Sequence, residues 1–352
     1  MINRITFHKT RMDILDQRVL PYKIAYLKAT SAAQTAKAIK DMVVRGAPLI
    51  GCTAAYGYAV ELNNRNPKSW GDTKKLLAQS AKVLKNSRPT AVALFYAIDD
   101  IHYCAMNFID KHKNEKFNRE LLNKLRRLIN NCAHRIYKED VSANNALASL
   151  GAKLLKRKSN VLTVCNAGSL ATAGIGTALG IIYKAHKQGK INRVYVCETR
   201  PYLQGSRLTM FELMQNKVPC FLITDNMSAH IIKTCKIDAI IVGADAIASN
   251  GDTANKIGTY MLAILAKYHK IPFYVAAPVP TFNFNFKTGA DIPIEERSPD
   301  EVCFIKNIRI APKGAKARHP AFDVTPAKLI TAIITEKGII TSVNRKNISK
   351  LL

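Results

Sequence analysis

The sequence has 352 residues, of which 48% are hydrophobic, and a chain of this size can bury a large core divided between two domains. No apolar run approaches the roughly 18 residues that a membrane span requires, and the first residues lack the apolar core of a secretion signal. The eight cysteines are never spaced as CxxC, which predicts a reduced, cytoplasmic protein without a zinc cluster.

The chain is strongly basic, with a formal net charge of +28 at pH 7. Its lysines and arginines are scattered, and no nucleic-acid motif or interleaving of aromatic and basic residues accompanies them. We therefore expect a basic surface rather than a nucleic-acid partner. A positive field would also attract a phosphorylated substrate.

The first 145 residues are predicted to form a mainly helical domain with a small sheet at its start. Short strands are expected at residues 5–7, 12–15 and 23–26. Ser31 is placed to cap a helix that runs to residue 44, and Pro48 lies in the first turn of a second helix over residues 49–63. Further helical periodicity covers residues 74–86, 91–113 and 119–148.

Residues 146–352 are predicted to form a second domain in which strands and helices alternate. This alternation is typical of an α/β fold with a doubly wound parallel sheet. Gly189 is expected to end a helix and Gly258 to lie within one, and Thr325-Pro326 to open a short helix ending at residue 336. The expected strands cover residues 161–164, 193–197, 220–223, 239–242 and 273–276, and the main helices 171–188, 205–216, 227–234 and 255–269.

Two of the predicted strand ends carry reactive side chains. Cys165 follows the strand at 161–164 and opens a glycine-rich stretch, and Asp245 follows the strand at 239–242. Ligands bind at the carboxyl ends of the strands in open α/β sheets, so this thiol and carboxylate indicate an active site of an enzyme. A free cysteine is otherwise most often an inert apolar side chain, an interpretation that we keep for the other seven. An aspartate after a strand is otherwise often a helix cap.

Three basic side chains are predicted to lie at helix starts, where backbone N–H groups favour phosphate. Arg45 precedes Gly46-Ala47-Pro48, Arg88 lies in the segment Ser-Arg-Pro-Thr at residues 87–90, and Lys256 follows Asn255. Both arginines could equally be ordinary surface residues. The histidines show no metal-ligand spacing, so no metal site is predicted.

Seven segments spread over nearly the whole chain resemble, in the same order, the methylthioribose-1-phosphate isomerase family. The resemblance implies a cofactor-free aldose–ketose isomerase of methionine salvage. It also implies a helical N-terminal domain, a Rossmann-like catalytic domain and a homodimer. The segments are residues 43–48, 165–168, 198–201, 203–209, 250–260, 294–297 and 320–326.

The resemblance implies a role for several residues in converting 5-methylthio-α-D-ribose 1-phosphate to 5-methylthio-D-ribulose 1-phosphate. Asp245 resembles the proton donor and Cys165 its thiol partner at the reacting carbons. Asn166 and Asp252 are expected to support the site or contact sugar hydroxyls. The residues expected to hold the substrate, chiefly its phosphate, are Arg45, Gly46, Ala47, Arg88, Gln204, Asn255 and Lys256.

The chemistry of a sugar 1-phosphate explains why an acid is needed. A phosphate on C1 prevents ordinary opening to a free aldehyde, so the bond between C1 and the ring oxygen must break with the phosphate in place. A general acid protonates the ring oxygen, and apolar surroundings would raise the pKa of such an acid toward neutrality. Hydrogen must then move from C2 to C1, either as a proton through an enol phosphate or as a hydride.

Two positions depart from the family pattern. Ala246 stands where the family usually has arginine, and His319 where it usually has asparagine. Ala246 is a feature shared with related ribose-1,5-bisphosphate isomerases and with regulatory subunits of a translation-initiation exchange factor, whereas residues 252–256 follow the methylthioribose pattern. The alternatives are therefore an isomerase of 5-deoxyribose 1-phosphate or ribose 1,5-bisphosphate, or a non-catalytic binding protein.

Overall fold

The computed structural model describes residues 2–88 and 91–352, and the chain divides into two compact units. Unit 1 comprises Met1–Ser142 and the short segment Leu170–Gly174. Unit 2 comprises Ala143–Ser169 and Ile175–Leu352. The long helix α5 (Arg119–Gly151) contains the first point at which the chain passes from one unit to the other.

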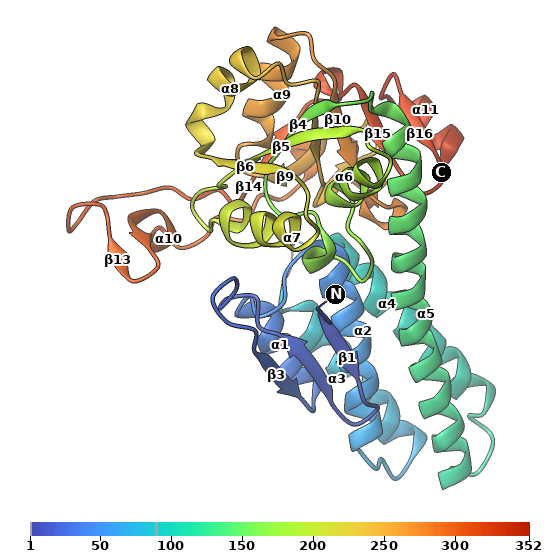
Figure 1. Ribbon diagram of the computed structural model, residues 1–352. Coiled ribbons are helices and arrows are strands. Elements are labelled where there is room, and N and C mark those ends of the chain that lie inside the picture. The colour runs from blue at the N-terminus through green and yellow to red at the C-terminus, as the bar shows by residue number, and fades with distance from the viewer. Residues whose placement is uncertain (1, 89–90) are drawn as a thin grey trace. The chain divides into compact units, whose positions relative to one another are not determined.

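Unit 1 begins with a three-stranded antiparallel sheet in the order β1 (Ile5–Phe7), β2 (Met12–Leu15), β3 (Tyr26–Ala29) (Figure 1). The first two strands were predicted correctly, but the third was expected at residues 23–26 and lies further along the chain. Its position is fixed by pairing, because Tyr26 lies opposite Leu15. The residues before Tyr26 instead form a loop, which the N–H of Asp16 closes by donating to the carbonyl of Ala25 at 2.8 Å.

Helices make up the rest of unit 1. The Ser31 hydroxyl accepts from the N–H of Gln34 and caps the first helix, as predicted. That helix ends before residue 44, however, because Met42 adopts φ +61° and the chain turns back. Val43 and Val44 are buried and continue the apolar pattern without being helical. The helices are α1 (Ala32–Lys40), α2 (Ala47–Asn64), α3 (Trp70–Lys85), α4 (Val92–Lys111) and the first part of α5.

Unit 2 is built on a seven-stranded sheet, and its α/β, doubly wound class is as predicted. All neighbouring strands are parallel except the last pair, β15 with β16. From edge to edge the order is β16 (Ile339–Thr341), β15 (Ala332–Ile334), β10 (Phe273–Ala276), β7 (Ala239–Val242), β4 (Ser159–Thr163), β5 (Ile191–Cys197) and β6 (Cys220–Ile223).

The two faces of this sheet belong to two apolar cores because side chains alternate along each strand. Leu162 and Ile240 pack in one core with α8 (Ser228–Thr234) and α9 (Thr259–Tyr268). Val161 and Ile241 pack in the other with α6 (Ala178–Lys187) and α7 (Met210–Gln215). Helices on both faces make the sheet a buried layer (Figure 1).

A four-stranded sheet in unit 2 was not predicted, and it corrects two helix assignments. Its order is β11 (Phe282–Asn283), β8 (Ala246–Ala248), β9 (Thr253–Lys256), β14 (Phe322–Thr325). The helix expected at 255–269 therefore begins only at Thr259, and Gly258 caps it with φ +99° instead of lying inside it. The helix expected at 325–336 is also wrong. A short 3₁₀ turn at Ala327–Leu329 is followed there by the buried strand β15.

Two other helices are shorter than the sequence predicted. Residues 172–177 form an irregular loop, so the helix expected at 171–188 is α6 alone. Residues Gly205–Thr209 form a π-helical turn before α7. Gly189 ends α6 as predicted, with φ +66°. The remaining elements are α10 (Asp300–Cys303), β12 (Phe304–Ile305), β13 (Ile308–Arg309) and α11 (Arg345–Leu351).

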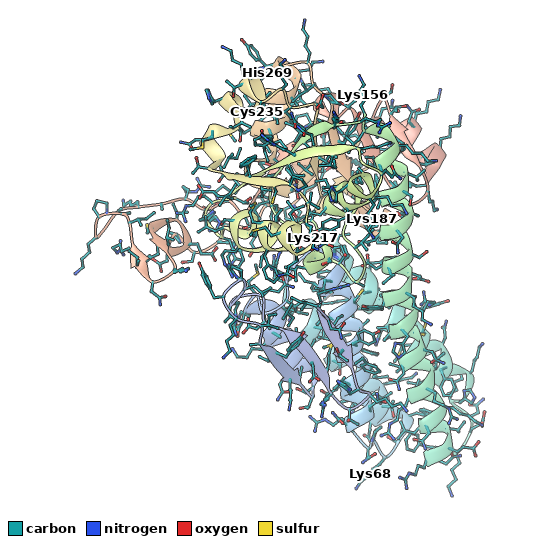
Figure 2. All side chains as sticks on the ribbon, in the orientation of Figure 1. Lys68, Lys156, Lys187, Lys217, Cys235 and His269 are labelled. Atoms are coloured by element: carbon teal, nitrogen blue, oxygen red, sulfur yellow. The ribbon has the colours of Figure 1, made fainter. Side chains whose placement is uncertain are left out.

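The lysines labelled in Figure 2 are exposed, so their charge lies at the surface. Lys68 is exposed on unit 1, and Lys156, Lys187 and Lys217 are exposed on unit 2. Among the described residues, no helix is both long and apolar enough to cross a membrane.

Candidate active site

The sheet order of unit 2 places the two predicted catalytic residues at a reversal point. From β4 the chain runs to β5 and β6 on one side and then returns to β7 on the other side of β4. Ligands bind beyond the carboxyl ends of the strands at such a reversal. Cys165 follows β4 and Asp245 follows β7, and the two strands pair directly, with Leu162 opposite Ile240.

The loops that carry Cys165 and Asp245 are also held near one another. The Thr163 hydroxyl at the end of β4 donates to the carbonyl of Ile241 in β7 at 2.8 Å. Beyond the strands, a Cβ on Gly243 would lie 3.0 Å from the Cβ of Ala167. Any larger residue at 243 would crowd the loop after Cys165, so this glycine permits the close approach.

Cys165 is buried, and its main chain is fixed on both sides. Its N–H donates to the hydroxyl oxygen of Thr199 at 2.9 Å, and its carbonyl accepts from the hydroxyl of Thr209 at 2.6 Å. The residue has φ +67°, a conformation that side chains other than glycine seldom adopt. Strained backbone held in place by tertiary hydrogen bonds is typical of functional sites. The main chain that carries the thiol is therefore held in one conformation, and Cys165 is 7% exposed.

Gln204 is the predicted binding residue that contacts this thiol. Its Nε2 donates to the Cys165 Sγ at 3.4 Å. The side chain is only 2% exposed, and its Oε1 is buried without a hydrogen-bond partner in the described part of the chain. An unsatisfied buried acceptor costs about 1–3 kcal/mol. A hydroxyl of a bound ligand would remove this cost by donating a hydrogen bond to Oε1.

The segment around Thr199 supports Cys165. No capping, turn or active-site pattern in the sequence predicts this supporting role. Thr199 has φ +65°, and its N–H donates to Asp225 at 2.8 Å. Its hydroxyl donates to the carbonyl of Cys197 while accepting from Cys165. A Cβ on Gly205 would lie 1.8 Å from that Cys197 carbonyl, so only glycine fits where the chain leaves Gln204. The family resemblance did mark segments 198–201 and 203–209.

Asn166 has a structural role. Its amide nitrogen donates to the carboxylate of Glu212 at 2.8 Å and to the hydroxyl of Thr209 at 3.2 Å. The same carboxylate accepts from both the N–H and the hydroxyl of Ser169, at 2.7 Å each. The buried Glu212 thereby fastens the loop that follows Cys165.

Asp245 lies in the connection between β7 and β8, and strand pairing brings it close to the predicted binding residues of β9. Its N–H donates to the carbonyl of Ala254 at 2.9 Å, next to Asn255. Asn255 is 3% exposed and its side-chain amide donates to Thr259 at 2.9 Å. Asn255 and Lys256 were expected at a helix start, but they lie on the strand β9, which pairs with β8 and β14.

Lys256 is held on β9 by the neighbouring strand β14. Its Nζ donates to the carbonyl of Ala321 at 2.8 Å and lies 4.4 Å from the centre of the Phe322 ring. Asp323, the next residue, accepts from the N–H groups of Gly258 and Tyr260 at the start of α9. Burial raises the pKa of the Asp323 carboxyl to about 6, although these hydrogen bonds and Lys256 act in the opposite direction.

Asp252, which is expected to support the site or contact a sugar hydroxyl, holds neighbouring loop segments in place. Its carboxylate accepts from the N–H groups of Ala327 and Gly289 at 2.9 Å and from the side chain of Asn250 at 2.8 Å. Burial acts to raise the pKa of Asp252, but these hydrogen bonds outweigh it and hold the pKa below its usual value. The carboxylate thus ties three loop segments together.

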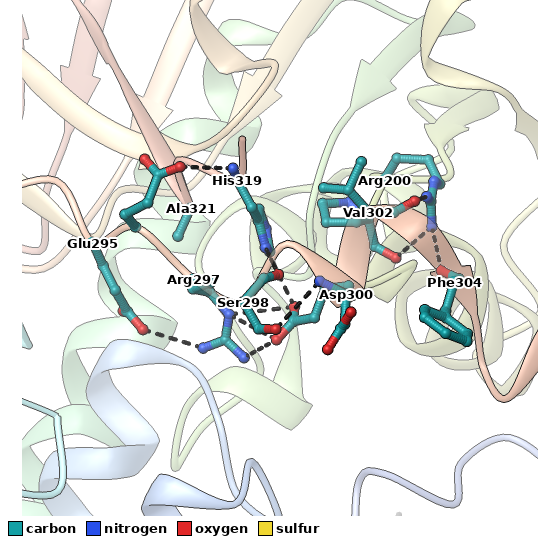
Figure 3. Close-up of polar contacts among 12 residues, drawn as sticks. Arg200, Glu295, Arg297, Ser298, Asp300, Val302, Phe304, His319 and Ala321 are labelled. Carbon is teal, nitrogen blue, oxygen red and sulfur yellow. Dashed lines mark hydrogen bonds and ion pairs between the residues drawn. The ribbon is translucent and has the colours of Figure 1, made fainter. Parts of the chain in front are cut away.

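His319, one of the two departures from the family pattern, lies in a polar cluster shown in Figure 3. It is 3% exposed, its Nδ1 lies 3.4 Å from the carbonyl of Ser298, and burial lowers its pKa. Arg297 forms ion pairs with Glu295 and Glu301, and its N–H donates to the carbonyl of His319. These contacts position the chain just before Ala321, the residue whose carbonyl holds Lys256.

The remaining predicted binding residues, Arg45, Gly46, Ala47 and Arg88, belong to unit 1. Gly46 caps α2 with φ +93°, Ala47 is its first residue, and Arg45 directly precedes them and is 8% exposed. This is the predicted helix start, whose first N–H groups have no partner within the helix itself. Arg88 is half-buried and its Nη1 contacts the Met42 sulfur at 3.0 Å. The rest of its predicted motif, Pro89 and Thr90, lies outside the described residues.

The side chains that unit 2 carries around this edge of the sheet are of the types used in acid–base chemistry. They combine a thiol, a carboxylate and an ammonium group with a buried amide acceptor. Within the described residues, no three His, Cys, Asp or Glu side chains are grouped so that they could hold a metal ion.

Comparison with known proteins identifies the family. The model of the initiation factor 2 subunit family matches residues 43–342. The methylthioribose-1-phosphate isomerase of Acetivibrio thermocellus is 50% identical over 339 residues, which cover 96% of each chain. The chain therefore belongs to the initiation factor 2 subunit family and, within it, to the methylthioribose-1-phosphate isomerases.

Solved structures agree with this placement. The 5-methylthioribose 1-phosphate isomerase from Pyrococcus horikoshii superposes with a TM-score of 0.89 at 41% identity, covering 100% of this chain and 96% of the other. A protein from A. fulgidus described as translation initiation factor eIF-2B, subunit delta, superposes with a TM-score of 0.85 at 39% identity. The coverage there is 100% of this chain and 99% of the other.

Proposed function

We propose that this chain is an aldose–ketose isomerase of methionine salvage that converts 5-methylthio-α-D-ribose 1-phosphate to 5-methylthio-D-ribulose 1-phosphate. One observation carries the proposal: Cys165 and Asp245 follow the paired strands β4 and β7 at the reversal point of the sheet. The 50% identity to an isomerase over nearly the full length supports the same reaction.

Asp245 is the proposed proton donor to the ring oxygen, and Cys165 is its partner at C1 and C2. The burial of Cys165 excludes bulk water from the reacting carbons, which protects an intermediate from side reactions. Gln204 donates to the thiol and, in this proposal, accepts a hydrogen bond from a sugar hydroxyl through its unsatisfied Oε1. Both routes for hydrogen, as a proton or as a hydride, use the same placement of these groups.

The phosphate is the proposed ligand of the basic and helix-start groups. A helix N-terminus offers unsatisfied N–H groups and a positive dipole end, and arginine adds a fixed charge. The proposed phosphate and substrate ligands are Arg45, Gly46, Ala47, Arg88, Gln204, Asn255 and Lys256.

The domain assignment, cellular location and assembly are also proposals. We assign residues 1–145 to a helical domain and 146–352 to the catalytic domain of a cytoplasmic, cofactor-free enzyme. We further propose a homodimer, which the exposed apolar side chains of α9, Tyr260, Met261, Ile264 and Tyr268, support. Light scattering of the purified protein should give twice the mass of one chain, and a monomer at micromolar concentration would contradict the assembly.

The substrate is tested by comparing kcat/KM for three sugars: 5-methylthioribose 1-phosphate, 5-deoxyribose 1-phosphate and ribose 1,5-bisphosphate. An apolar pocket around the C5 substituent would favour the first two sugars. A pocket without a cation at that position would reject the second phosphate of the bisphosphate. We expect the methylthio sugar to give the highest value. A preference for the bisphosphate would overturn the substrate and leave the reaction type in place.

A non-catalytic role has one observation in its favour, the 39% identity to the A. fulgidus protein. The presence of both candidate catalytic residues, Cys165 and Asp245, argues against a non-catalytic role. Absence of turnover with all three sugars, in protein shown to be folded by circular dichroism, would favour the binding role.

A further inference from the structure

Unit 1 contains five residues of the loop that follows Cys165. The segment Leu170–Gly174 is separated in sequence from the rest of unit 1 by about thirty residues, yet it belongs to that unit. Leu170, Ala171 and Ala173 are each at most 4% exposed, so the segment is buried there. A buried loop needs partners for its peptide groups, and these partners are specific side chains.

Arg4 and Asp140 hold the two peptide groups that flank Ala173. Arg4 is 8% exposed, and its Nη2 donates to the carbonyls of Ala173 and Gly174, the latter at 3.1 Å. The carboxylate of Asp140 accepts from the N–H of Ala173 at 2.6 Å. The pKa of the neighbouring Cys52 thiol is raised, by burial first and then by Asp140, while Arg4 acts to lower it. Both charges therefore act within the same buried region.

Gln17 connects the same segment to the residues before α2. Its side-chain amide donates to the carbonyl of Leu170 at 2.8 Å, and its own N–H donates to the carbonyl of Val43 at 2.9 Å. Val43 begins the stretch that ends in Arg45-Gly46-Ala47.

Gly46 lies directly against the segment. A Cβ built on Gly46 would lie 2.4 Å from the Cα of Ala171, and its φ of +93° also favours glycine. The turn before α2 thus packs against Ala171 with no space to spare. Any displacement of Ala171 would change the conformation available to Gly46.

We propose that Arg4 is a positioning residue for the phosphate-binding turn Arg45-Gly46-Ala47, acting through the segment 170–174. A buried guanidinium is costly, and its Nε has no hydrogen-bond partner in the described part of the chain. An apolar side chain at position 4 would fill the same space at a lower desolvation cost. The guanidinium of Arg4 instead fixes the carbonyls of Ala173 and Gly174 in one geometry. The proposal rests on the proposed function, since it assumes that the turn before α2 binds phosphate.

The test compares Arg4→Met with the matched control Arg11→Met, since Arg11 is an exposed arginine of the same N-terminal region. We expect Arg4→Met to raise KM for the sugar 1-phosphate about tenfold while kcat stays within about threefold, because charge-assisted hydrogen bonds are lost. The affinity for inorganic phosphate, measured by calorimetry, should fall by a similar factor. Arg4→Lys should recover part of both, and Arg11→Met should leave both unchanged.

A purely structural role for Arg4 predicts a different result, namely a lower melting temperature with normal KM and normal phosphate affinity in the folded protein. That outcome would overturn the proposal. If Arg4→Met does not fold, Arg4→Lys and Gln17→Met provide the same comparison. If wild-type protein binds phosphate but turns over no sugar, the proposed function fails and the calorimetry still tests Arg4. If it binds no phosphate, the role of Arg4 is refuted as well.

Discussion

The two units present their candidate ligand-binding groups in different ways. In unit 1, Arg45, Gly46 and Ala47 are consecutive residues at the start of α2, so the site there is local in sequence. In unit 2, Cys165, Gln204 and Asp245 come from three separate connections between strands and are assembled by the order of the strands. The local group is suited to hold a phosphate through backbone N–H groups, whereas the assembled group supplies reactive side chains.

Because unit 2 supplies the reactive side chains, we expect substitutions of these side chains to act mainly on kcat. Asp245→Asn removes the proton and Cys165→Ser removes the polarisable thiol, and each should lower kcat by a factor of roughly 100 or more. Cys197→Ser is the matched control, because Cys197 is also buried and its thiol lies 3.4 Å from the hydroxyl of Ser228. Steady-state kinetics of the three variants measures the effect. Near-normal kcat in both site variants would refute the assignment.

Substitution at the start of α2 is expected to act mainly on KM. Arg45→Ala should raise KM for the sugar 1-phosphate by about tenfold or more, because a charged phosphate contact is lost. Arg65→Ala is the control at the other end of the same helix, where the exposed Arg65 forms an ion pair with the buried Glu61. Inorganic phosphate should compete with substrate less well in Arg45→Ala than in the control. An unchanged KM for Arg45→Ala would remove the functional contrast between the units.

Gln204 sharpens the comparison because it was predicted as a binding residue but contacts the thiol. Gln204→Leu should lower kcat/KM by about tenfold, since it removes both the donor to Cys165 and the unsatisfied acceptor. Gln215→Leu is the control, as Gln215 is exposed on α7. An effect confined to KM would indicate substrate binding, whereas an effect on kcat would indicate an influence on the thiol. Equal activity in both variants would contradict either role.

Asp323, which caps α9 from a distant strand, is expected to affect stability rather than kinetics. Its pKa of about 6 in the folded protein is above the value in an unfolded chain, so its stabilising contribution is present below about pH 4 and is lost as the pH rises through 6. The free energy of unfolding of wild type relative to Asp323→Asn should therefore fall by about 2–3 kcal/mol between pH 4 and pH 7. Urea unfolding at pH 4, 5, 6 and 7 and constant ionic strength measures it. Parallel curves for the two proteins would contradict the assigned pKa.

Strand pairing explains why parts of unit 2 were mispredicted. Residues 253–256 carry no strong strand pattern, and their register is set by β8 and by β14, about 70 residues further along the chain. Lys256 was consequently placed at a helix start. The role of Glu212 in fastening the loop after Cys165 was missed for the same reason, since its partners Asn166 and Ser169 lie more than 40 residues away.

The sequence by itself determined the alternation of strands and helices in unit 2, the cap at Ser31, the first-turn position of Pro48, and the family through its ordered motifs. These features depend on residues within a few positions of one another, so propensity and capping chemistry identify them. Only the tertiary structure decided the start of α9, whose first N–H groups donate to Asp323 more than 60 residues away. It also decided the contact between Gln204 and Cys165 and the burial of segment 170–174 in unit 1. Hydrogen bonds between distant residues depend on how strands and loops pair in space, and no local pattern records that pairing.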